Sequence, residues 1–152
     1  MSIGSTLDIK DLLRSKCVIH VIGSRDSGKT SAIVEALKHL SAMGYKVAVI
    51  KHTHHSVDTP FKDTWRYIHN GGALISVAVK DLGEEIAIFI DGNRGGDAAR
   101  EVLSKIIESV DLVIVEGYSG VYLGDEIHID RPSDIPIIAN EILSRALKCV
   151  ER

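Results

Sequence analysis

The stretch Gly23-Ser24-Arg25-Asp26-Ser27-Gly28-Lys29-Thr30 fits the pattern G-x-x-x-x-G-K-[ST], which is typical of a loop whose backbone N–H groups surround a phosphate. An apolar run at 17–22 precedes it and predicts a buried strand. After it, Ile33, Leu37 and Leu40 recur at helical spacing and predict a helix. Because the motif requires a strand, a loop and a helix in that order, its surroundings favour a phosphate-binding loop over a glycine turn beside a surface lysine.

The residue types within this loop suit a nucleotide phosphate. Gly23 and Gly28 allow the backbone to turn its N–H groups inward, and the helix that follows contributes the positive end of its dipole. We expect Lys29 to reach the β- and γ-phosphates and the Thr30 hydroxyl to hold a bridging Mg²⁺. The predicted nucleotide-binding residues of this segment are Gly23, Ser24, Arg25, Asp26, Ser27, Gly28, Lys29, Thr30 and Ser31.

Length and composition indicate one globular nucleotide-binding domain over residues 1–152. The chain has 152 residues, of which 45% are hydrophobic and 26% are charged. Its formal net charge of −3 gives no general basic surface for nucleic acid. No apolar stretch approaches a membrane span and no signal peptide is evident, so we expect a cytoplasmic protein. In that reducing setting Cys17, within the first strand, is expected to be a buried free thiol, and Cys17 and Cys149 are too few for a disulfide framework.

The order of predicted elements indicates an α/β fold of the P-loop NTPase type, with a mostly parallel sheet, helices on both faces and an antiparallel hairpin. Strands at 17–22 and 46–50 flank the first long helix and form a βαβ unit. The connection 81–84 is too short for a crossover helix, so the strands 74–79 and 86–90 form the hairpin. That hairpin either joins the main sheet or forms an arm that reaches a second subunit.

Apolar periodicity and capping residues predict the remaining elements. They are a helix at 5–14, a helix that begins at 62, a helix at 97–109 with Ala98, Val102 and Ile106 inward, a strand at 111–117, a short strand near 127–129, a strand at 136–139 and a final helix capped by Asn140. Ligands of open α/β sheets bind at the carboxyl ends of the strands, so the residues that follow the strands are the candidates for chemistry.

Two acids end apolar strands, where Walker B carboxylates contact Mg²⁺. Glu116 ends one buried strand and precedes Gly117, which allows a phosphate to approach closely. Asp91 ends the second hairpin strand, which need not lie beside the loop. We favour Glu116, which forms the predicted catalytic pair with Lys29 and the predicted metal site with Thr30. An ordinary strand-end carboxylate is the alternative at both positions.

The run Lys51-His52-Thr53-His54-His55 lies at the carboxyl end of the second strand. Lys51 can reach a bound anion there, and we include Lys51, His52, His54 and His55 among the predicted nucleotide-binding residues. His52 and His54 would share a face if the strand continued, a spacing that can bind a metal. No Cys-x-x-Cys accompanies them, so histidines that face solvent or phosphate are favoured.

The residues alone do not identify the base. Many guanine-binding P-loop proteins carry Asn/Thr-Lys-x-Asp after a late strand. Asn140 stands at a comparable place, but Glu141 occupies the position of the lysine, so the motif is absent. GTP and ATP are therefore not distinguished at this level.

The phosphate loop, the histidine run and Val115-Glu116-Gly117-Tyr118 together resemble the family of molybdopterin-guanine dinucleotide biosynthesis protein B (MobB). That family's pattern continues from the phosphate loop through Lys-His-x-His-His, an aspartate and Gly-Lys-Asp-Ser/Thr to Glu-Gly-Tyr/Phe-Lys. In this chain, Phe61 stands in place of the glycine that precedes Lys62 in the pattern, and Ser119 stands in place of the lysine that follows Tyr118. The resemblance covers roughly residues 17–118, and the matching residues beyond the loop are Lys51, His52, His54, His55, Asp58, Lys62, Asp63, Thr64, Arg66, Gly72, Ala73, Glu116, Gly117 and Tyr118.

The resemblance implies a GTP-binding, Mg²⁺-dependent homodimer that is at most a weak GTPase. Such a protein assists the nucleotidyltransferase that joins GMP to molybdopterin, and Lys51 with the histidines would face the nucleotide or the molybdopterin cofactor. Two other functions stay open from the residues alone. One is a P-loop small-molecule kinase, and the other is a metal-insertion NTPase that uses the cluster His52, His54 and His55.

Overall fold

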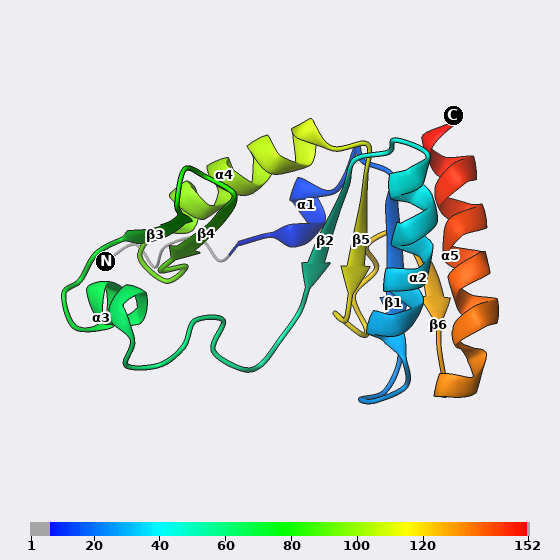
Figure 1. Cartoon of the computed structure of the whole chain (residues 1–152), viewed down its shortest axis with the longest axis horizontal. Coiled ribbons are helices and arrows are strands. Elements are labelled where there is room, and N and C mark those ends of the chain that lie inside the picture. The colour runs from blue at the N-terminus through cyan, green and yellow to red at the C-terminus, as the bar shows by residue number, and fades with distance from the viewer. Residues whose placement is uncertain (1–6, 152) are drawn as a thin grey trace. The chain divides into compact units, whose positions relative to one another are not determined.

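The computed structural model describes residues 7–151, which form two compact units (Figure 1). The parallel-sheet unit comprises Ile9–His52 and the described chain from Ser104 onward. The hairpin unit comprises Thr53–Leu103 and the described residues before Ile9. Among the helices of this described part, none is long and apolar enough to cross a membrane.

The parallel-sheet unit is built on four parallel strands in the order β2, β5, β1, β6 (Figure 1). β1 (Val18–Ile22) and β5 (Leu112–Glu116) are buried along their whole length, so they form the centre of the sheet, as their apolar sequences predict. β2 (Val47–Lys51) and β6 (Asp125–His128) form the edges. Because all four strands run the same way, their carboxyl ends meet at one edge of the sheet.

Helices cover both faces of this sheet, as predicted. On one face, α2 (Lys29–Ala42) and α5 (Ile135–Val150) pack on the apolar side chains of β1, β5 and β6. On the other face, α1 (Ile9–Leu12) and the C-terminal turns of α4 (Gly96–Ser109) contribute to a second apolar cluster. The central strands are therefore shielded from water on both sides.

The segment 136–139 is helical, so the strand predicted there is wrong, and Asn140 lies inside the helix rather than at its cap. After the 3₁₀ turn η1 (Pro132–Asp134), Pro136 occupies the first turn of α5, where its missing N–H costs no hydrogen bond. A short apolar run fits the spacing of a buried strand as well as that of a buried helix, which explains the error. The buried side chains show the helical spacing instead: Ile138, Ala139, Ile142 and Ala146.

Two predicted helices differ from the sequence-based expectation. In α4, Ala99 and Ile107 are buried and Ile106 is 42% exposed, so the inward face predicted through Ile106 is wrong by one residue. Ile106 and Ile107 are adjacent and both apolar, so the spacing of apolar residues alone did not show which of the two faces inward. The helix predicted at 5–14 is shorter within the described residues, because α1 covers only Ile9–Leu12, and the first two predicted positions, 5 and 6, lie outside them.

The two cysteines form a disulfide, which corrects the expectation of a buried free thiol at Cys17. Cys17 precedes β1 rather than lying within it, and Cys149 lies in the last turn of α5, with 5.7 Å between their Cα atoms. α5 packs along β1, which brings its last turn to the start of that strand. Their separation of 132 residues in the sequence gave no spacing signal for this pair.

The hairpin unit contains α3 (Asp63–His69) and the antiparallel strands β3 (Ile75–Lys80) and β4 (Glu85–Ile90). The predicted hairpin is confirmed, and it forms a two-stranded sheet of its own rather than extending the main sheet. Its register pairs Val77 with Ile88, and both side chains are exposed. One face of the hairpin therefore presents apolar side chains to solvent.

Candidate functional site

The predicted phosphate loop connects β1 to α2 at the carboxyl edge of the sheet (Figure 1). A Cβ at Gly23 would lie 2.3 Å from the Ile129 carbonyl oxygen, so only glycine fits there. Gly28 has φ +101°, and a Cβ on it would lie 2.8 Å from Cγ1 of Ile135. Both glycines are therefore required by close packing of the loop against the chain that leads into α5.

The tip of the loop is open to solvent, while one of its side chains is buried. Ser24, Arg25 and Asp26 are exposed, and Asp26 adopts the left-handed conformation with φ +61°. Ser27 is 2% exposed, and its hydroxyl has no hydrogen-bond partner among residues 7–151. A buried hydroxyl without a partner is unusual, and a bound polar group such as a phosphate would satisfy it.

Lys29 folds back across the loop. Its Nζ donates hydrogen bonds to the carbonyl oxygens of Gly23, at 2.7 Å, and Ser24, at 2.8 Å. Both acceptors are neutral, so these bonds orient the ammonium group without cancelling its charge. The positive charge is thus held over the loop, where a polyphosphate would lie.

Thr30 and Glu116 meet beside the loop. The Thr30 hydroxyl donates to the Glu116 carboxylate, with Oγ1 2.9 Å from Oε1 and 3.1 Å from Oε2. Lys51 pairs with Glu116 in the sheet register, and its Nζ lies 3.9 Å from Oε1. The structure therefore brings together the phosphate loop, Lys51 and the acid that ends β5. Ser31, the next residue of α2, is exposed beside them.

This arrangement has the donor set of a magnesium site. Hydroxyl and carboxylate oxygens are the ligands that Mg²⁺ prefers, and it usually takes one or two from the protein and the rest from water and phosphates. Thr30 and Glu116 supply such oxygens within hydrogen-bond distance of each other. Among the described residues, no group of three or more His, Cys, Asp or Glu side chains is placed to hold a metal. The pair therefore fits a metal shared with a nucleotide.

Asp91, the competing acid, is engaged within the hairpin unit. The Arg94 Nε donates to its Oδ2 at 2.5 Å, and the hydrogen bond from Arg94 holds the pKa of Asp91 below its usual value. The same guanidinium donates to the carbonyls of Gly72 and Ala73. Asp91 thus joins the end of β4 to the turn before β3, which is a structural role.

The histidine run is divided between the two units. His52 lies in the parallel-sheet unit, where its N–H donates to the Glu116 carbonyl at 2.9 Å. Its ring stacks on Tyr118, with centroids 4.3 Å apart and planes 20° apart. His54 and His55 lie in the hairpin unit, so only His52 of the three is placed beside the phosphate loop within one unit. α3, which follows these two histidines in the sequence, also lies in the hairpin unit.

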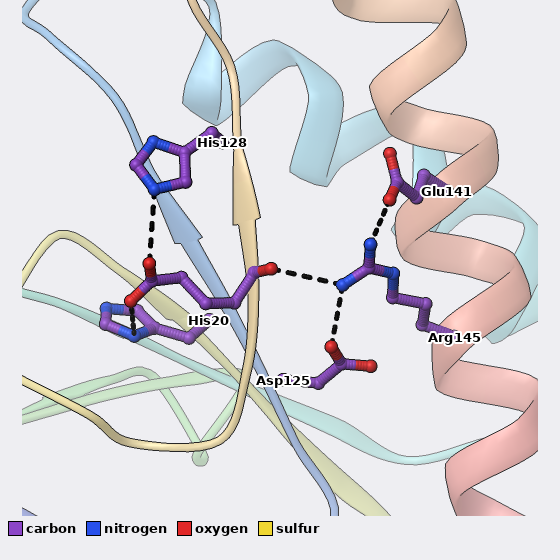
Figure 2. Close-up of polar contacts among 6 residues, drawn as sticks. His20, Asp125, His128, Glu141 and Arg145 are labelled. Carbon is purple, nitrogen blue, oxygen red and sulfur yellow. Dashed lines mark hydrogen bonds and ion pairs between the residues drawn. The ribbon is translucent and has the colours of Figure 1, made fainter.

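His20 is a site residue that the sequence analysis missed. It lies within the apolar run of β1 and is fully buried. Its Nε2 donates to the Gly117 carbonyl. Its Nδ1 lies 3.8 Å from Oε2 of Glu126, a contact that a dashed line from His20 marks in Figure 2. Gly117 and Tyr118 both have positive φ, at +96° and +56°, so His20 contacts a turn of unusual conformation directly after Glu116. A histidine inside an otherwise apolar strand was the available signal.

A polar network continues from His20 to α5 (Figure 2). Glu126 accepts a hydrogen bond from Nε2 of His128 at 3.1 Å. Arg145 donates to the Glu126 carbonyl at 3.1 Å and to Asp125 Oδ1 at 2.7 Å. These contacts fix the edge strand β6 against α5, and so support the strand next to His20.

The chain is similar to proteins of molybdenum cofactor synthesis. The sequence pattern of the family Molybdopterin guanine dinucleotide synthesis protein B (MobB) matches residues 18–138. A putative molybdopterin-guanine dinucleotide biosynthesis adapter protein of Methanocaldococcus jannaschii is 40% identical over 102 residues, which are 66% of this chain and 40% of that protein. The molybdopterin-guanine dinucleotide biosynthesis adapter protein of Haemophilus influenzae is 30% identical over 105 residues, which are 66% of this chain and 56% of that protein. The chain thus spans about half the length of these curated relatives.

Solved structures share the fold at low sequence identity. Bacillus subtilis MobB superimposes with a TM-score of 0.57 at 18% identity, over 85% of this chain and 97% of that one. A structure of molybdopterin-guanine biosynthesis protein B gives a TM-score of 0.54 at 24% identity, over 86% and 99% of the two chains. These likenesses agree with the P-loop NTPase fold that the loop and the strand order indicate. Because the family pattern matches most of the length of this chain, the chain belongs to the MobB family.

Proposed function

We propose that this protein binds GTP with Mg²⁺ and acts as an accessory protein of molybdopterin guanine dinucleotide synthesis, assisting the nucleotidyltransferase that joins GMP to molybdopterin. The observation that carries the proposal is the Thr30–Glu116 contact beside an intact phosphate loop, in a chain of the MobB family. The curated relatives are named as adapter proteins of this synthesis, which supports an accessory role.

The residues of the loop and of β5 would divide the work of nucleotide binding. Lys29 would contact the β- and γ-phosphates, and residues 23–31 would surround them with N–H groups. Thr30 and Glu116 would hold Mg²⁺, which neutralises developing charge on the phosphates when it is bound. We expect slow hydrolysis at most, because the acid beside the loop, Glu116, is committed to the Thr30 hydroxyl and the metal rather than free to activate water.

Lys51 and His52, at the carboxyl end of β2, would approach the same nucleotide site. Lys51 is 62% exposed at its side chain, which leaves its ammonium group accessible to an anion even though it also approaches Glu116. The stacked rings of His52 and Tyr118 form a flat aromatic surface next to Glu116. We also propose that His54 and His55 contact the nucleotide or the molybdopterin cofactor.

We further propose that the protein works as a cytoplasmic homodimer, in which each chain acts as a single nucleotide-binding domain. The exposed apolar face of the hairpin supports the dimer, because Val77, Val79, Ile86 and Ile88 are each about half exposed. Sedimentation equilibrium of the wild type and of Val77→Glu tests this: the substitution should give monomers that still bind GTP.

Calorimetric titration of GTP and ATP, each with and without Mg²⁺, tests the nucleotide-binding function. We expect tighter binding of GTP, with a clear dependence on Mg²⁺, and slow turnover in the absence of a partner. A preference for ATP would favour the small-molecule kinase instead. Co-purification with the nucleotidyltransferase in the presence of GTP tests the accessory role separately, and its absence under conditions of full GTP occupancy would contradict that role.

A further inference from the structure

A cleft of about 390 Å³ lies between α2 and α5 in the parallel-sheet unit. Its volume falls within the range of small-molecule sites, which is roughly 300–1,000 Å³. The cleft combines an apolar wall with three polar side chains, none of which belongs to the site described above. Its lining residues are Glu35 and His39 from α2, and Ile135, Pro136, Ala139 and Asn140 from α5.

The cleft begins next to the phosphate loop. Ile135 lines it, and the same side chain packs so closely on Gly28 that a Cβ there would lie 2.8 Å from Cγ1. Glu35 lies seven residues after Gly28 on α2, which is about 10 Å along the helix axis at 1.5 Å per residue. A nucleoside attached to phosphates on the loop can therefore extend along the cleft.

Two polar side chains of the cleft have hydrogen-bonding atoms that are available to a ligand. Glu35 forms an ion pair with Lys38, whose Nζ lies 2.8 Å from Oε1, and this hydrogen bond lowers the pKa of Glu35, which is therefore ionised at neutral pH. Its Oε2 accepts no hydrogen bond within the described part of the chain. The Asn140 amide is exposed and likewise has no hydrogen-bond partner among residues 7–151, so it offers both a donor and an acceptor.

We propose that this cleft binds the guanine ring of the nucleotide, with the ring against Ile135 and Pro136, the Glu35 carboxylate accepting from the guanine N1–H and 2-amino groups, and the Asn140 amide donating to O6 or N7. The assignment rests on the proposed function, since it places the base of the nucleotide whose phosphates occupy the loop. Adenine has an acceptor at N1 and no 2-amino group, so an ionised Glu35 disfavours it. The cleft thus takes the place of the absent Asn/Thr-Lys-x-Asp motif.

The test compares three titrants, each with Mg²⁺: GTP, ATP and inorganic tripolyphosphate. The variants are Glu35→Gln and Asn140→Ala. The matched control is Glu108→Gln, which also changes an exposed helical glutamate paired with a lysine three residues away, Lys105. We expect Glu35→Gln to weaken GTP binding by about tenfold to a hundredfold, as loss of a charged hydrogen-bond acceptor does, and Asn140→Ala by about tenfold. Binding of ATP and tripolyphosphate should change less than about twofold, and the control should match the wild type.

The outcomes separate the two proposals. A wild type that prefers GTP, with cleft variants that lose the preference and keep tripolyphosphate binding, supports the base site. A wild type that prefers GTP, with cleft variants of unchanged preference, overturns the base site alone. A wild type that binds neither GTP nor tripolyphosphate overturns the nucleotide-binding function and the base site together. Thermal unfolding of each variant shows that any loss of binding occurs in folded protein, which is expected because both side chains are on the surface.

Discussion

The hydroxyl of Thr30 donates to the carboxylate of Glu116, 2.9 Å from Oε1, and so joins the first turn of α2 to the end of β5. The two residues are separated by 86 positions in the sequence. Their contact exists because β5 pairs with β1 in parallel register and ends beside the phosphate loop, which follows β1. A metal bound here would be held by these two oxygen atoms, which are already adjacent, and the hydrogen bond between them would be lost.

Substitution Glu116→Gln should weaken Mg²⁺-dependent GTP binding more than metal-free binding. The amide keeps the size of the side chain and a hydrogen bond with Thr30, but it loses the negative charge that attracts the metal. We expect a loss of about 1.5–3 kcal/mol in the presence of Mg²⁺, measured by calorimetry with and without EDTA. Asp91→Asn is the matched control and should leave both affinities unchanged. Equal losses for Glu116→Gln in the two conditions would contradict the metal role.

Substitution Lys29→Ala should abolish most phosphate binding and leave the fold intact. Among residues 7–151, the ammonium group donates hydrogen bonds to the carbonyls of Gly23 and Ser24 alone, so its loss removes few contacts from the folded state. We expect a cost of about 1.5–3 kcal/mol in tripolyphosphate and GTP binding, by calorimetry. Lys105→Ala, on α4, serves as the control. A Lys29→Ala protein that is unfolded by circular dichroism would show that the lysine holds the loop together instead.

Substitution His20→Leu should disturb the Glu116 site from inside the sheet. His20 donates to the Gly117 carbonyl, and leucine would leave that partly buried acceptor without its partner, at a cost of about 1–3 kcal/mol in the free energy of unfolding. Because this hydrogen bond is made to the residue directly after Glu116, we expect Mg²⁺-dependent GTP binding to fall as well. His20→Gln, which keeps an N–H donor, should restore much of both. Urea unfolding and calorimetry measure the two effects, and equal behaviour of the leucine and glutamine variants would rule out a positioning role for the hydrogen bond.

The sequence was sufficient for the parts of the site that are contiguous in the chain. The phosphate loop, the strands before and after it and the acid that ends β5 were all identified from local patterns, because a buried parallel strand and an amphipathic helix each have a recognisable composition. The hairpin was equally predictable, since the short connection between its strands permits only an antiparallel pair.

The errors arose where tertiary packing decides. The apolar run at 136–139 suits a strand or a buried helix, and only its packing against α2 selects the helix that forms one wall of the cleft. His20 has no partner near it in sequence, because Gly117 and Glu126 reach it through strand pairing. The histidine run appeared to be one cluster, yet the boundary between the two units falls directly after His52.

The Cys17–Cys149 disulfide should contribute substantially to stability. It closes a loop over a separation of 132 residues, for which the chain-entropy model gives about 5 kcal/mol of stabilisation as an upper value. We expect Cys149→Ser to lower the free energy of unfolding in urea by about 2–5 kcal/mol under oxidising conditions. The wild type in excess dithiothreitol should behave like the variant, while the variant itself should not respond to the reductant. A wild type whose two thiols both react with iodoacetamide in the native, non-reduced state would show that the bond is not formed, and no difference in stability would then be expected.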